Sequence, residues 1–137
     1  MNCEPIYTAP LTEEETRFLN PLVLAYVGDA VHSLYVRCRL ASSSDAKVGA
    51  LEAKAVKEVS AVSQSAVAER LSEFMNEAES DVYRRARNAK PSHFAKNANE
   101  AEYKRATGFE ALIGYLYLSG NRERLEALFD FAANGAK

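Results

Sequence analysis

The sequence has little cysteine and no long apolar run. Its two cysteines, Cys3 and Cys38, form neither a disulfide framework nor a metal-ligand spacing, so a reducing cytoplasm is the expected location. No run approaches the roughly 18 apolar residues that a membrane-spanning helix needs. The start, MNCEPIYTAPLTEEE, lacks the basic segment and apolar stretch of a signal peptide. We therefore expect neither secretion nor a membrane span.

The composition is that of a folded globular protein. Hydrophobic residues make up 47% and charged residues 26% of the chain, far from the composition of disordered proteins. A length of 137 residues suits one continuous core. We expect a single domain over residues 1–137.

The formal net charge of −2 hides an uneven distribution of charge. Residues 84–105 hold seven of the 17 lysines and arginines but only two of the 19 acids. A mildly acidic body with one basic segment suits the local binding of a polyanion such as nucleic acid. The alternative is that these basic side chains are merely the solvated ends of helices.

Helix signals dominate, and no convincing alternation of apolar and polar residues is present, which predicts an all-α fold of about seven helices. Caps, prolines and apolar stripes delimit them. The first expected helix opens at the Thr12–Glu15 capping box, and the second runs from Pro21 to about Leu40 behind an Asn20 cap. Four more helices are expected over 45–58, 60–75, 77–88 and 99–118. An amphipathic helix after Gly120-Asn121 is expected to close the chain. Residues 89–97 are expected to form an exposed loop.

The helices at 21–40 and 99–118 are expected to be buried, and each carries one acid inside its apolar stretch. Asp29 is the only charged residue in 20–36, and Glu110 the only one in 106–118. No lysine or arginine lies one turn from either acid, and a bare carboxylate is costly to bury. If the helices pack together, Mg²⁺ or Mn²⁺ between the acids would relieve both desolvation and repulsion. Otherwise each acid is a structural hydrogen-bond partner.

The neighbours of these acids favour a metal-dependent site. Gly28 and Gly114 remove bulk beside them, which would allow a close approach of backbones or of substrate. A carboxylate-held metal beside a basic segment suggests phosphodiester hydrolysis. His32 is expected to be a core residue or a residue that supports the acids from behind, whereas His93, in the basic loop, is expected to touch RNA.

Two motifs carry a resemblance to a known family. The segment LVLAYVGDAV at 22–31 resembles the ribonuclease III signature helix, ERLEFLGDAV, and TGFEALIGYLYL at 107–118 resembles the second acidic motif, DxxEALIGAxYL. Their order and spacing match the family. The short branch called Mini-ribonuclease III is more similar still, because RNAK at 87–90 and KNA at 96–98 also occur in it.

The resemblance implies an all-helical endonuclease domain, without a double-stranded RNA-binding domain, that dimerises largely through the signature helix. It implies cleavage of double-stranded RNA to 5′-phosphates with Mg²⁺, or with Mn²⁺ as a substitute, and carries Asp29 and Glu110 over as catalytic acids and metal ligands. The branch's role implies maturation of the large-subunit (23S) ribosomal RNA precursor, with a ribosomal protein as a candidate partner that presents the RNA. The expected RNA contacts are Arg84, Arg85, Arg87, Lys90, His93 and Lys96.

Departures from the larger enzymes leave alternatives open. Leu22 and Ala25 stand where those enzymes have glutamates, and Thr107 stands where they have an aspartate, so the number of metals is undecided. A non-catalytic RNA-binding or dimerisation module on the same fold is the alternative. A di-iron helical protein is disfavoured because its Glu-x-x-His pairs are lacking.

Overall fold

The computed structural model describes residues 10–90 and 99–134, which form seven α-helices and one short 3₁₀ helix with no strand among them. The predicted all-α fold is confirmed. The elements are α1 (Glu13–Arg17), α2 (Pro21–Ser43), α3 (Val48–Glu58), α4 (Ala61–Ala68), η1 (Leu71–Glu73), α5 (Glu77–Asn88), α6 (Glu100–Leu118) and α7 (Arg122–Asn134).

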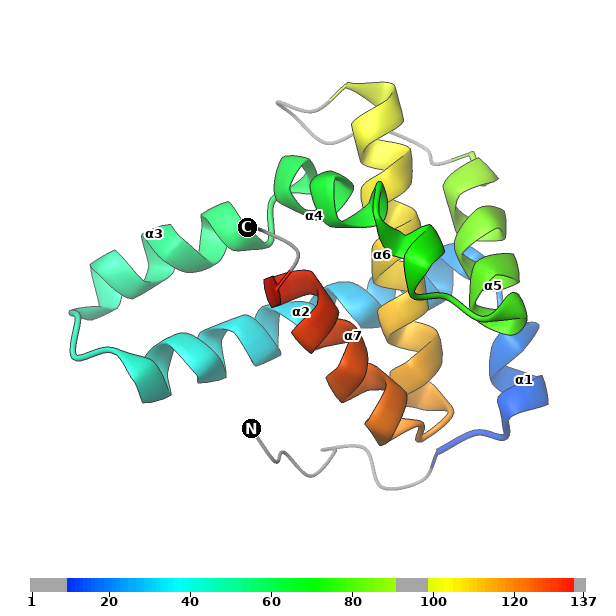
Figure 1. The fold of residues 1–137 in the computed structure, drawn as a ribbon, viewed down its shortest axis with the longest axis horizontal. Coiled ribbons are helices and arrows are strands. Elements are labelled where there is room, and N and C mark those ends of the chain that lie inside the picture. The colour runs from blue at the N-terminus through cyan, green and yellow to red at the C-terminus, as the bar shows by residue number, and fades with distance from the viewer. Residues whose placement is uncertain (1–9, 91–98, 135–137) are drawn as a thin grey trace.

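Helix α6 is the centre of the fold. It runs through the middle of the molecule, and α2, α4, α5 and α7 pack against it (Figure 1). Residues 106–116 of α6 are buried except for Glu110, as the unbroken apolar pattern predicted. The second half of α2 and all of α3 form a pair of helices that extends away from this body (Figure 1).

Most helices begin where their caps predict. The Thr12 and Asn99 side chains each accept a hydrogen bond from the backbone three residues on, and the glutamates at those positions return one, so both are capping boxes. Asn20 caps α2, with Pro21 at its first position. Asn76 and Glu79 form a further box, which opens α5.

Three helix boundaries differ from the sequence predictions. Helix α2 continues to Ser43 because the hydroxyls of Ser42 and Ser43 donate to the Cys38 and Arg39 carbonyls, at 2.8 and 2.7 Å, and extend the last turn. Helix α3 begins only at Val48, without a side-chain cap. The helix predicted over 60–75 is broken after Ala68, and η1 follows it.

Helix α2 is not buried all round, so that prediction was wrong. Val23, Tyr26 and Leu34 are 46%, 79% and 47% exposed. Asp29 is exposed as well. The cause is that α6 and α3 cover α2 on one side, while this apolar face has no neighbour within the described part of the chain.

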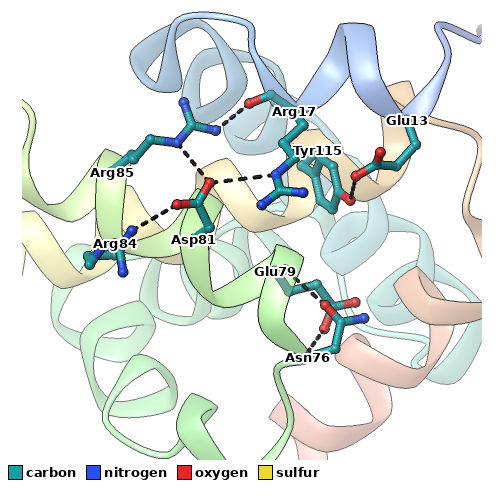
Figure 2. A network of polar contacts seen from close by, with 8 residues as sticks. All are labelled: Glu13, Arg17, Asn76, Glu79, Asp81, Arg84, Arg85 and Tyr115. Atoms are coloured by element: carbon teal, nitrogen blue, oxygen red, sulfur yellow. Dashed lines mark hydrogen bonds and ion pairs between the residues drawn. The ribbon is translucent and has the colours of Figure 1, made fainter.

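One ion pair and one hydrogen bond hold the outer helices in place. Glu79 of α5 is 1% exposed, and its two oxygens receive Arg124 Nε at 2.9 Å and an Arg124 terminal nitrogen at 2.5 Å, which ties α7 to α5. On the other side, Tyr115 Oη of α6 donates to Glu13 of α1 at 2.6 Å (Figure 2). No described helix is both long and apolar enough to cross a membrane.

Candidate active site

Two glycines bring the backbones of α2 and α6 into direct contact. A Cβ atom placed on Gly28 would lie 1.7 Å from the Glu110 carbonyl oxygen, and one placed on Gly114 would lie 2.0 Å from the Leu24 carbonyl oxygen. Only hydrogen fits at these two positions. The crossing therefore sets Asp29, the residue after Gly28, beside Glu110.

Asp29 and Glu110 form a carboxyl pair at this crossing, as the sequence predicted for packed helices. The Asp29 side chain is close enough to Glu110 to act on its pKa. Burial, followed by the hydrogen bond and charge of Asp29, raises the pKa of Glu110 to about 9. Because Asp29 is exposed, the pair has one acid set into the helix interface and one facing solvent.

A buried amide contacts Glu110, and a buried imidazole contacts that amide. Gln64 of α4 is 2% exposed, and its Nε2 lies 3.0 Å from His32 Nδ1 and donates to Glu110 Oε2 at 3.4 Å. His32 packs edge-on against Phe109 and stacks on Phe129, so it is the core residue that the sequence predicted. Burial lowers the pKa of His32 to about 4, against the opposing charges of Glu58 and Asp29, so the ring is neutral at pH 7.

Sequence reasoning missed Gln64. A single glutamine in the polar stretch SQS is ordinary for a helix surface, and no acid or metal-ligand spacing draws attention to it. The pattern that could have indicated its burial is its neighbourhood, since Ala61 and Ala68 lie one turn to either side of it.

The donor set fits a hard divalent cation. Within residues 10–90 and 99–134 no group of three or more His, Cys, Asp or Glu side chains could hold a metal. Two carboxylates are nonetheless enough for Mg²⁺, which is often bound through one or two carboxylates while water and substrate phosphates supply the rest. A desolvated carboxyl group hydrogen-bonded to a second one is also the arrangement that a cation would relieve most.

Three arginines line a pocket of about 420 Å³ between α4, α5 and α6. Arg84 and Arg87 come from α5 and Arg105 comes from α6. Arg105 Nε also donates to Ser65 Oγ at 2.8 Å, and Ser65 is the residue after Gln64. The arginine pocket and the acid pair are thus joined through two consecutive residues of α4.

The other predicted RNA contacts have different surroundings. Arg85 is turned toward α1, and its guanidinium donates to the Arg17 carbonyl there (Figure 2). The same guanidinium also donates to Asp81 of α5, at 3.2 Å. Arg84 meets the other oxygen of Asp81 at 2.8 Å. Lys90 is exposed just after α5. His93 and Lys96 lie outside the described residues.

Comparison with known proteins assigns the chain to a family. Residues 22–121 match the model of the Ribonuclease III domain. The chain therefore belongs to the ribonuclease III domain family, and it is an endoribonuclease.

Relatives within the family share most of the chain. It is 42% identical to the Mini-ribonuclease 3 of Thermoanaerobacter sp., over 91% of this chain and 88% of that protein. It is 46% identical to that of Symbiobacterium thermophilum, over 85% and 89%. A crystal structure of a Fusobacterium nucleatum protein superposes with a TM-score of 0.79 at 27% identity, covering 90% of this chain and 98% of that one. The resemblance inferred from the motifs is confirmed.

Proposed function

We propose that this endoribonuclease hydrolyses phosphodiester bonds in double-stranded RNA with Mg²⁺, and that Asp29 and Glu110 are its catalytic and metal-binding residues. The observation that carries the proposal is the carboxyl pair at the glycine crossing of α2 and α6. The relatives named Mini-ribonuclease 3 support it. Mn²⁺ is proposed as a substitute metal.

The roles of the residues follow from their placement. When bound, the metal supplies a Lewis acid that activates water and stabilises charge on the phosphate. Asp29 and Glu110 hold it in their ionised forms, and the rigid crossing fixes the separation between them. Hydrolysis breaks the bond from phosphorus to the 3′ oxygen, leaving a 5′-phosphate and a 3′-hydroxyl.

Cleavage of a labelled RNA duplex and of its separated strands, each with Mg²⁺ or with chelator, tests this proposal. We expect cutting of the duplex alone, dependent on metal, with 5′-phosphate ends. Binding of the duplex without any cutting, even within a precursor ribosomal RNA, would contradict the proposal and favour the non-catalytic module.

The basic segment is proposed to hold the phosphates of the duplex. Arg84 and Arg87 line the arginine pocket, and Lys90 is exposed just after the end of α5. His93 and Lys96 are proposed as further contacts from the sequence alone. Arg85 remains a sequence-based candidate, although its contacts with Asp81 and α1 already give it a structural role. A-form RNA would be recognised by its shape and backbone more than by its sequence.

Arg87→Ala with Lys90→Ala is expected to weaken duplex binding about tenfold and to lower the salt slope of log K by about one unit per lost phosphate contact. Binding is measured by fluorescence anisotropy at several salt concentrations. The control is Lys54→Ala with Lys57→Ala, which removes the same charge from exposed positions on α3. An unchanged slope in the first variant would remove Arg87 and Lys90 from the RNA contacts.

A homodimer through α2 is proposed as the working form. The exposed apolar face of Val23, Tyr26 and Leu34 lies along the helix that carries Asp29. Large side chains exposed in a row on one helix are typical of an interface. A twofold dimer would give two active sites, one for each strand of a duplex.

Leu34→Glu is expected to convert the dimer to monomer, because a dimer would desolvate the new carboxylate. Sedimentation equilibrium measures the mass. Val62→Glu is a matched control, since Val62 is 49% exposed but lies on α4. Equal masses for Leu34→Glu and the wild type would rule out this face as the interface.

The natural substrate is proposed from the resemblance of the motifs to the Mini-ribonuclease III branch. It is the large-subunit ribosomal RNA precursor, processed in the cytoplasm, with a ribosomal protein as a candidate partner that presents the RNA. Comparing cleavage of the precursor with and without large-subunit ribosomal proteins tests this assignment. If the protein cut the precursor no faster than an unrelated RNA duplex, both with and without the ribosomal proteins, the assignment would be wrong.

A further inference from the structure

We propose that Gln64 is a positioning residue, whose amide fixes the orientation of the Glu110 carboxylate from α4. The inference rests on the proposed function, because it gives Gln64 a role toward a metal-binding acid. Gln64 does not touch the metal or the substrate in this account. It acts through Glu110.

The geometry is that of one nitrogen with two partners. Gln64 Nε2 lies 3.0 Å from His32 Nδ1 and 3.4 Å from Glu110 Oε2. An amide nitrogen has two N–H groups, so it can serve one partner with each. His32 Nδ1 then accepts, and its ring proton is on Nε2. The result is a chain of hydrogen bonds from α2 through α4 to α6.

The far end of this chain is rigid. The His32 ring is 6% exposed and is held between Phe109, at 5.3 Å between ring centroids, and Phe129, at 6.0 Å. Gln64 itself is 2% exposed on a helix that packs against α6. A glutamate side chain has three rotatable bonds, and a donor fixed from both sides selects one of its orientations.

The amide also donates its hydrogen bond to the carboxylate, as a group supporting an ionised metal ligand should. The hydrogen bond from Gln64 favours the ionised form of Glu110, whereas burial and Asp29 favour the protonated form. With Oε2 bonded to the amide, Glu110 would hold the cation in one fixed orientation of its carboxylate. Removing a group that orients a metal ligand in this way typically lowers metal affinity or activity by roughly 10- to 100-fold.

Gln64→Leu tests the inference, since leucine fills a similar volume without a donor. In the duplex-cleavage assay we expect kcat to fall about 10- to 100-fold and half-maximal activity to require more Mg²⁺. KM for the duplex should be unchanged, because the RNA contacts are elsewhere. Mn²⁺ affinity of the RNA-free protein, measured by electron paramagnetic resonance, should fall in parallel.

Two further variants separate orientation from packing. Gln64→Glu keeps the shape but offers an acceptor to Glu110, so kcat should fall at least as far as in Gln64→Leu. Gln64→Asn keeps the amide but shortens the side chain by one methylene group. It replaces Gln64→Leu as the test variant if leucine prevents folding. Asp130→Asn, at an exposed position on α7 away from the arginine pocket, is the control and should leave kcat and Mn²⁺ affinity unchanged.

The outcomes distinguish the inference from the proposed function. If the wild type cuts the duplex while folded Gln64→Leu and Gln64→Asn keep both kcat and Mn²⁺ affinity, the role of Gln64 is wrong and the nuclease proposal stands. If the wild type does not cut, the nuclease proposal fails. Mn²⁺ affinity then decides on Gln64 alone, because unchanged affinity in its variants would overturn the inference.

Discussion

Glu110→Gln is expected to stop cleavage of duplex RNA while leaving the protein folded and able to bind the duplex. The amide keeps the shape of the side chain but cannot hold a cation as a carboxylate does. A loss of about a thousandfold or more in kcat corresponds to about 4 kcal/mol of transition-state stabilisation. Asp29→Asn should behave in the same way. Single-turnover cleavage and duplex binding are measured side by side.

Glu110→Gln should also change how the free energy of unfolding depends on pH in metal-free buffer. Because the pKa of Glu110 is about 9 in the folded protein, against 4.5 for an ordinary glutamate, the folded state keeps a proton that the unfolded chain loses between these two pH values. The free energy of unfolding of the wild type should therefore be highest at the acidic end of this window and decline as pH rises toward 9. Glu110→Gln removes that decline.

Urea unfolding of the metal-free protein at pH 6 and pH 9 checks this expectation. Asp130→Asn, at an exposed position on α7, is the matched control and should keep the wild-type decline and the wild-type cleavage rate. If Glu110→Gln instead lost much stability at both pH values, Glu110 would be a structural hydrogen-bond partner, and its assignment as a metal ligand would be wrong.

Gly114→Ala is expected to destabilise the fold by about 3 kcal/mol or more. The new methyl group would lie 2.0 Å from the Leu24 carbonyl oxygen, and a backbone atom cannot rotate away as a side chain can. The two central helices would have to separate. Gly28→Ala should be at least as damaging, because its methyl group would lie 1.7 Å from the Glu110 carbonyl oxygen.

Gly49→Ala provides the matched control. Gly49 also lies in a helix, α3, but nothing is within 4 Å of the position of an added Cβ atom. Alanine there should stabilise the protein by roughly 0.5 to 1 kcal/mol, because glycine is the poorer helix former. Urea unfolding at one fixed protein concentration measures all three variants. Equal effects at positions 49 and 114 would contradict the close helix crossing.

The sequence predicted the helices because their signals are local. Thr12 with Glu15 forms a capping box within one turn, as does Asn99 with Glu102, and such signals do not depend on the rest of the fold. The break after Ala68 was not predictable in this way, since an apolar stripe continues through Val67, Leu71 and Phe74. Periodicity reports which side chains face the core, not whether the backbone stays α-helical.

The acid pair was predictable because charge inside an apolar helix is rare. Asp29 and Glu110 stood out on that ground, and the glycines indicated a close approach. The exposure of α2 could not be predicted from its apolar pattern alone, since an apolar face looks the same whether another part of this chain or a second molecule covers it. Gln64 was missed because its importance lies in tertiary contacts with His32 and Glu110, which no spacing along the chain reveals.

Mn²⁺ binding to the RNA-free protein, followed by electron paramagnetic resonance, tests most directly whether Asp29 and Glu110 are the metal site. It is measured for the wild type, Asp29→Asn, Glu110→Gln and the control Asp130→Asn. We predict that the wild type and Asp130→Asn bind with the same affinity, and that both site variants lose this binding. Wild-type affinity for Mn²⁺ in Glu110→Gln would contradict the account.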